Sequence, residues 1–111
     1  MKRDYKLYLN DIKESIGLIE RYISGADEEQ FIKNIDLQDK AIRRLEIIGE
    51  AITNIPRALK EKNPNSIWEK FSEFRNFITH HYFEASLKRV WKVLKEDIPL
   101  LKKVIDNIKL V

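Results

Sequence analysis

Both histidines of this 111-residue chain lie in one short segment, residues 74–83, together with an arginine and a tyrosine. Arg75 stands five positions before His80, and Tyr82 follows that histidine by two positions. An imidazole can change its charge near neutral pH, and a guanidinium can hold a phosphate through two parallel hydrogen bonds. These residue types at this spacing therefore permit acid–base chemistry on a phosphate group.

Cleavage of an RNA phosphodiester is a reaction that needs these parts. A base removes the proton of the 2′-hydroxyl, an acid protonates the leaving 5′ oxygen, and a fixed cation stabilises charge on the phosphoryl oxygens. Arg75 and His80 would lie about 140° apart around a regular helix, which makes joint action within one chain awkward. Either the helix unwinds after Thr79, or two copies of the chain contribute to one site.

Each of these residues also has an ordinary structural explanation. A single arginine on a helix is usually solvated, and a histidine at a helix end often caps carbonyl groups. The whole pattern Arg-x4-His-x-Tyr, however, is expected by chance only roughly 0.005 times in a chain of this composition. Chance therefore explains the combination poorly.

The first third of the chain has the hydrophobic spacing of a helix. Apolar residues step by four and three over residues 5–23, which predicts a first helix, and Gly25 then supplies a stop. Residues 30–34 are expected to form at most a short helical turn that places Phe31 in the core.

A second long helix is predicted over residues 37–55, behind a possible Asp36 N-cap, ending near Pro56 or in the turn of residues 63–65. It is apolar on more than one side, which implies burial at the centre of a bundle or against another chain. Gly49 inside it predicts a close helix crossing, because glycine costs about 1 kcal/mol relative to alanine in a helix. A tolerated, neutral position is the alternative.

A third helix is predicted to begin at Ile67 behind a Ser66 cap and to run toward the two histidines. Its core-facing stripe consists of Ile67, Phe71, Phe74 and Ile78. Phe77 points away from this stripe, so a monomer would leave its ring wet. A second chain on that side would bury the ring and bring His80 into a shared cleft.

A fourth helix is predicted over residues 87–108, behind a Ser86 cap, with Pro99 forcing a kink or a restart. No strand pattern competes, and short connections favour antiparallel neighbours. The fold class is therefore predicted to be all-α, a four- to five-helix up-and-down antiparallel bundle, with residues 1–111 as a single domain.

Composition excludes several classes of protein. The chain has no cysteine, 43% apolar and 35% charged residues, and only three glycines and three prolines. Thiolate zinc sites, iron–sulfur clusters, disulfide scaffolds and cysteine nucleophiles are thereby ruled out. A net charge of +3 suits a polyanionic partner without diagnosing one. No segment has the length and hydrophobicity of a secretion signal or a membrane span, which predicts a cytoplasmic protein with no membrane partner.

Two carboxylates on the second long helix, Glu46 and Glu50, stand one turn apart. Such a pair can bind a metal or assist acid–base chemistry. Salt-bridged or solvated side chains are the favoured interpretation, because no Glu-x-x-His spacing completes a bundle-type di-metal site. No metal and no cofactor are expected.

Residues 75–82 resemble the Arg-x4-His-x-Tyr signature of HEPN-domain ribonucleases of the HepT toxin type. Residues 41–51 resemble the Ile-Gly-Glu-Ala helix of that family, and Trp68 and Trp91 fit its pattern on either side of the signature. The resemblance covers nearly the whole chain. It implies a HEPN-like homodimer that cuts RNA without a metal, as the toxin of a type VII toxin–antitoxin pair. The implied partner is a nucleotidyltransferase antitoxin of the MntA type.

The same resemblance implies residue roles. Arg75 and His80 would be catalytic at the dimer-interface cleft, and Asn76 would help to orient the site. His81 occupies the variable position beside His80 and would support it, and the spacing favours His80 as the acting imidazole. Tyr82 matches the tyrosine that such antitoxins modify with AMP, which would place negative charge and bulk beside Arg75 and compete with RNA. A core aromatic is the alternative for Tyr82.

The alternative function is a non-catalytic HEPN module that binds a nucleotidyltransferase partner or a nucleotide. A helix-turn-helix DNA-binding protein is disfavoured, because the basic residues are scattered and no compact helix pair with a short glycine turn stands out.

Overall fold

The structure, a computed structural model, describes residues 3–78 and 84–108, with only the backbone described at 84–85. The described residues form helices and no strand, which confirms the predicted all-α fold class. The helices are α1 (Tyr5–Ile23), α2 (Glu28–Lys33), α3 (Ile35–Thr53), α4 (Arg57–Lys62), α5 (Ile67–Ile78), α6 (Glu84–Lys92) and α7 (Ile98–Asp106), and a π-helical segment, η1 (Val93–Asp97), joins α6 to α7. Among the described residues, no helix has both the length and the apolar character needed to cross a membrane.

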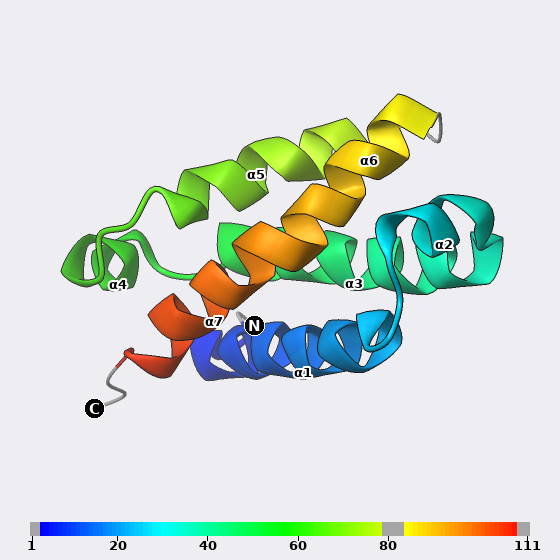
Figure 1. The fold of residues 1–111 in the computed structure, drawn as a ribbon. Helices are drawn as coiled ribbons and strands as arrows, with labels where there is room; N and C mark the ends of the chain where they lie inside the picture. The colour runs from blue at the N-terminus through cyan, green and yellow to red at the C-terminus, as the bar shows by residue number, and fades with distance from the viewer. Residues whose placement is uncertain (1–2, 79–83, 109–111) are drawn as a thin grey trace.

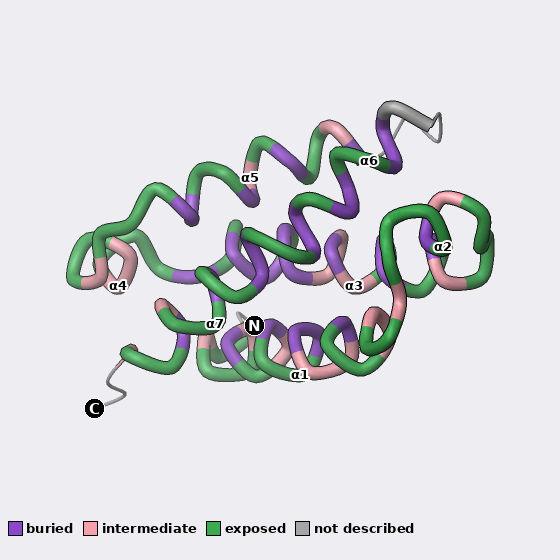
Figure 2. The backbone as a smooth tube through the Cα atoms, viewed as in Figure 1, coloured by how far each residue is buried: buried purple, intermediate pink, exposed green. Residues whose placement is uncertain are grey.

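The bundle is built around α3, which lies between α1 and α5 (Figure 1). The rod formed by α6, η1 and α7 runs across these helices and contacts α2 with α6 and α1 with α7. Buried positions recur along α1, α3 and α5 (Figure 2). The predicted burial of the second long helix at the centre of a bundle is thus confirmed.

The start of the chain folds as its sequence predicts. α1 spans the predicted residues, and Gly25 follows it in a left-handed conformation with φ of 76°, which glycine adopts without steric cost. Phe31 on α2 is fully buried, and its ring centroid lies 5.4 Å from that of Trp91 on α6. The expected short helical turn therefore does place Phe31 in the core.

The N-terminal cap of α3 differs from the prediction. The helix begins at Ile35, and the side chain of Asn34, not of Asp36, accepts a hydrogen bond from the N–H of Leu37. Asp36 lies in the first turn instead, where its charge complements the positive end of the helix dipole. The two residues have equally good cap chemistry, so the α2–α3 turn decides between them.

The starts of α5 and α6 also differ from the predicted caps. α5 begins at Ile67 as predicted, but Asn65 rather than Ser66 supplies a side-chain oxygen, which accepts from the Ile67 N–H at 2.9 Å. α6 begins at Glu84, so Ser86 lies inside the helix and is buried. The Ser86 cap was wrong because helical structure extends upstream of the hydrophobic spacing that located the helix.

Pro99 interrupts the last helix, as predicted, through a π-helical turn. Within η1 the hydrogen-bonded loop widens, and the Ile98 N–H donates to the carbonyl of Val93, five residues earlier. Proline lacks a backbone N–H and its ring clashes with the carbonyl four residues before it. A wider turn immediately before Pro99 accommodates both effects, and α7 restarts at Ile98.

Candidate functional site

The second half of α5 carries the part of the candidate site that the structure describes. Four side chains of this helix are buried as predicted, namely Ile67, Phe71, Phe74 and Ile78. They fix the rotation of α5 about its own axis. Arg75 and Asn76 consequently lie outside the buried stripe and are exposed.

α5 crosses α3 at Gly49, where the absent side chain makes room for Arg75. A Cβ atom placed on Gly49 would lie 3.0 Å from the Cβ of Arg75 and 3.3 Å from its Cγ. This separation is shorter than ordinary van der Waals contact, so the stem of Arg75 rests directly on the backbone of α3. The predicted close crossing at Gly49 is confirmed, and the residue that makes it is the candidate catalytic arginine.

The guanidinium of Arg75 is not neutralised by a described carboxylate. The side chain is exposed, and no ion pair among the described residues includes it. Its stem is restrained by contact with Gly49. A solvent-facing cation on a restrained stem is suited to bind an external anion.

The opposite side of α5 faces an arginine of α6 that the sequence analysis did not single out. The guanidinium carbon of Arg89, on α6, lies 4.0 Å from the centre of the Phe77 ring and 5.7 Å from that of Phe74. The two rings stack on each other, with centroids 5.6 Å apart. Phe77 is half-buried within this one chain, so the expectation that a monomer leaves its ring wet was wrong in part.

His80, His81 and Tyr82 lie outside the described residues, in the connection between α5 and α6. The structure therefore brings Arg75 together with Asn76 and Gly49, and it leaves the roles of the two imidazoles and of Tyr82 as predictions. Whether one chain or two chains assemble the site also stays a prediction.

A family model matches most of the length of this chain. The model of the family described as "Ribonuclease HepT-like" matches residues 12–108, which include α3, α5 and the segment between α5 and α6. The chain belongs to the HepT-like ribonuclease family. No solved structure matches it.

Similar proteins occur in archaea. A Methanocaldococcus jannaschii protein named "Gamma-glutamylcyclotransferase and putative RNase" is 47% identical over 108 residues, which cover 97% of this chain and 49% of that protein. The chain thus spans about half of that relative. "Probable ribonuclease HepT" of Thermococcus cleftensis is 40% identical over 109 residues, covering 98% of this chain and 99% of that protein. A "Putative RNase" of M. jannaschii is 39% identical over 105 residues, covering 95% and 96% of the two chains.

The two carboxylates of α3, Glu46 and Glu50, lie in different environments. Glu46 forms an ion pair with Arg43, with 3.4 Å between the charged groups, as the favoured interpretation expected. Glu50 lines a separate cavity of about 370 Å³ between α1 and α3, which Arg3 also lines. Arg3 donates to Asp11 at 2.6 Å, and this hydrogen bond raises the pKa of Arg3. Over residues 3–78 and 84–108, no group of three or more potential ligands could hold a metal ion.

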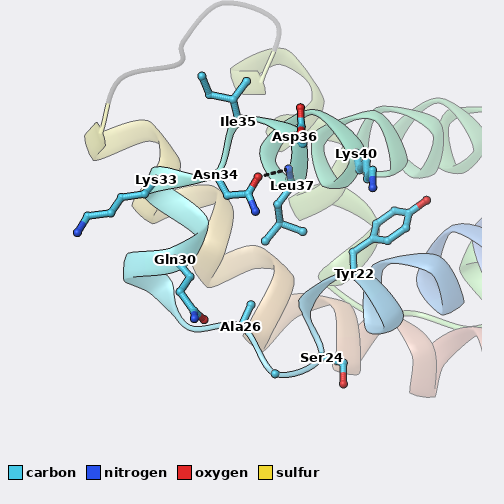
Figure 3. Close-up of a pocket in the computed structure, with 11 residues that line it drawn as sticks. Tyr22, Ser24, Ala26, Gln30, Lys33, Asn34, Ile35, Asp36, Leu37 and Lys40 are labelled. Atoms are coloured by element: carbon cyan, nitrogen blue, oxygen red, sulfur yellow. Dashed lines mark hydrogen bonds between the residues drawn. The ribbon is translucent and has the colours of Figure 1, made fainter.

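A larger cavity, of about 860 Å³, lies at the junction of α1, α2 and α3 (Figure 3). The ammonium of Lys40 lies 5.8 Å from the centre of the Tyr22 ring there, and Asn34 accepts from the N–H of Leu37. Among the residues whose side chains the structure describes, none that lines this cavity belongs to α5 or α6. The cavity is therefore separate from the surface around Arg75.

Proposed function

We propose that this chain is the ribonuclease toxin of a type VII toxin–antitoxin pair, and that it cleaves RNA without a metal at a cleft shared by two copies. The observation that carries the proposal is Arg75, an exposed cation seated on Gly49, five residues before His80. Membership of the HepT-like ribonuclease family supports RNA as the substrate.

In the proposed reaction, an imidazole takes the proton of the ribose 2′-hydroxyl, and the freed oxygen attacks the adjacent phosphorus. The bond from phosphorus to the 5′ oxygen breaks, and a second imidazole protonates that oxygen as it leaves. The products are a 2′,3′-cyclic phosphate and a 5′-hydroxyl. His80 of each copy supplies one imidazole, and Arg75 stabilises the charge that gathers on the phosphoryl oxygens.

Two neighbours complete the proposed site. Asn76 is exposed next to Arg75 on the last turns of α5, where a side-chain amide can orient the phosphate or the ribose. His81 supports His80 from the adjacent position. A twofold arrangement brings both sets to one groove, because each copy presents the same surface to the other.

Regulation is proposed to act through Tyr82. A nucleotidyltransferase antitoxin of the MntA type would transfer AMP from a nucleoside triphosphate: the phenol oxygen attacks the α-phosphorus and pyrophosphate leaves. The bound AMP adds a negative phosphate and a bulky nucleoside within reach of Arg75. It would compete with RNA for that cation and silence the enzyme.

The deciding experiment is cleavage of single-stranded RNA in EDTA by the purified protein. We expect cuts that leave 2′,3′-cyclic phosphate ends, their loss in His80→Ala, and their persistence at a reduced rate in His81→Ala. Tyr82→Phe should cut RNA and should resist inhibition by the antitoxin with nucleoside triphosphate. Continued cleavage by His80→Ala would contradict the assignment.

A cellular assay separates this function from the non-catalytic alternative. Expression of the toxin should arrest growth, and Arg75→Ala should relieve the arrest. A docking or nucleotide-binding module would leave growth unaffected in both cases.

A further inference from the structure

The outer side of α6 and η1 carries a concentration of positive charge that the proposed site does not use. Four exposed cations, Lys88, Arg89, Lys92 and Lys95, occupy the face opposite the buried side of this rod, and we call them the α6 basic face. Residues 88–95 contain no aspartate or glutamate. No ion pair between described residues includes any of the four.

We propose that the α6 basic face binds the phosphate backbone of the RNA substrate and leads the strand to Arg75. This inference rests on the proposed ribonuclease function and extends it to a surface outside the Arg-x4-His-x-Tyr segment. The ligand class is single-stranded RNA, recognised by charge along its backbone rather than by base sequence.

The stacking of Arg89 connects this face to the candidate site. Its guanidinium lies 4.0 Å from the centre of the Phe77 ring, and Phe77 follows Arg75 by two residues on the same helix. Arg89 therefore sits at nearly the same level along α5 as Arg75, with the two separated by about 160° around the helix axis. A strand that crosses the last turns of α5 meets a cation on each side.

The chemistry of Arg89 suits a phosphate. A guanidinium over the face of an aromatic ring loses part of its rotational freedom, and the N–H groups along the edge of its planar fork can still donate hydrogen bonds. Such an edge can hold a phosphate through two hydrogen bonds. Lys92 and Lys95 continue the positive charge along the rod. At a helical rise of about 1.5 Å per residue, the four cations from residue 88 to residue 95 span about 10 Å.

A polyanion fits this face better than a protein partner does. Protein interfaces bury an apolar core, with charges at the rim. The large hydrophobic side chains exposed in the described structure are Leu7, Ile35 and Leu100, and none of them lies on α6 or η1. The acidic group nearest in sequence, Glu96, lies beyond Lys95, and Asp97 is buried and paired with Lys70 at 2.7 Å.

The test measures how the affinity for a short single-stranded RNA depends on salt, in a His80→Ala background that does not cut the probe. The test variant combines Lys88→Gln, Arg89→Gln and Lys92→Gln. The matched control combines Lys13→Gln, Arg21→Gln and Lys103→Gln, which removes the same charge from exposed positions on α1 and α7. Both sets are exposed, and thermal melting confirms that each variant is folded.

We expect the slope of log affinity against log salt to fall by about 2 in the test variant, since each lost phosphate contact removes about 0.7. Affinity near physiological salt should fall more than tenfold in the test variant and little in the control. Arg89→Lys alone should keep the slope and weaken binding by a few-fold, because it retains the charge and loses the planar stack.

Failure of this inference is distinguishable from failure of the proposed function. If the wild-type protein cuts RNA and the test variant matches the control in slope and affinity, the α6 basic face does not bind the substrate. The same conclusion follows if the test variant loses binding to the antitoxin while it keeps its affinity for RNA. If the wild-type protein neither binds nor cuts RNA, the proposed function fails and this inference fails with it.

Discussion

The two sides of α5 hold arginines by different physical means. Toward α3, Arg75 is positioned by the absence of a side chain at Gly49, with 3.0 Å between its Cβ and the place where a Cβ would stand. Toward α6, Arg89 is positioned by attraction to the Phe77 ring at 4.0 Å. A close steric contact such as that of Arg75 with Gly49 is lost when a single methyl group is added. The contact of Arg89 with the ring weakens gradually as the distance between them grows. The first suits a group that must meet a reacting phosphate, and the second suits a group that follows a flexible strand.

Removal of Arg75 should have the largest effect. We expect Arg75→Ala to lower the RNA cleavage rate by about 10²- to 10³-fold, as loss of a charge-stabilising donor typically does. Arg75→Lys should recover only part of the rate, because an ammonium cannot form the paired hydrogen bonds of a guanidinium. Single-turnover kinetics measure both. Near-normal cleavage by Arg75→Ala would show that this side of α5 is not the reacting side.

Adding a methyl group at Gly49 tests whether the space beside this glycine positions Arg75. Gly49→Ala should slow cleavage by about tenfold, because the new methyl group must displace the stem of Arg75 by a few tenths of an ångström. The free energy of unfolding should change little, because the gain of about 1 kcal/mol in helix propensity is offset by the close contact of the new methyl group with Arg75.

Gly17 on α1 offers the matched control for this substitution. A Cβ atom there would meet no neighbour within 4 Å. Gly17→Ala should therefore raise the free energy of unfolding by up to about 1 kcal/mol and leave cleavage unchanged. Equal kinetics in the two alanine variants would remove Gly49 from the positioning of Arg75.

On the α6 side, Phe77→Leu removes the ring beneath Arg89 while it keeps an apolar side chain. A surface cation–π contact contributes about 0.5–1 kcal/mol, so we expect RNA affinity to fall by roughly two- to fivefold. Phe77→Tyr, which preserves the ring face, should behave as wild type. Equilibrium binding in the His80→Ala background reports the effect, and a drop of equal size in Phe77→Tyr would exclude stacking as its cause.

The smallest predicted effect comes from Glu73, an exposed carboxylate on α5. It lines the same cavity of about 160 Å³ as Arg89 and Lys70. Glu73→Gln should raise RNA affinity by roughly twofold, because it removes a negative charge beside the α6 basic face. Glu14→Gln on α1 removes the same charge at a distance from α5 and should have no effect on binding. A fall in affinity for Glu73→Gln would place the RNA elsewhere.

Local spacing predicted the features of the fold that depend on neighbours in sequence. The buried stripe of α5, the stop at Gly25 and the crossing at Gly49 all follow from helical periodicity and from glycine chemistry. The cap of α3 did not, because Asn34 and Asp36 are both good cap residues and the turn after α2 selects between them. Cap chemistry alone is thus too permissive to fix a helix start.

The candidate site shows the same division. Arg75 and the close crossing at Gly49 were each predictable, since the arginine belongs to a motif and the glycine is conspicuous inside an apolar helix, but their contact with each other was not. The position of Arg89 depends on how α6 packs against α5, and Arg89 lies twelve positions after Phe77 in the sequence. A signal was nevertheless present, because residues 88–95 combine four cations with no acidic group. The net charge of +3 over the whole chain conceals this local concentration of cations.

The π-helical turn before Pro99 sets the rotation of α6 relative to α7 about the axis of the rod that they form. On the C-terminal side of this turn, α7 packs against α1. On its N-terminal side, α6 places Arg89 over the Phe77 ring. Each residue inserted into or removed from a helix rotates everything on one side by about 100°. Shortening this turn by one residue would swing Arg89 a quarter-turn or more off its ring while α7 stayed docked. The orientation of Arg89 is thus set by η1, which begins four residues after it, and by Pro99, ten residues after it, because this proline requires the wider turn.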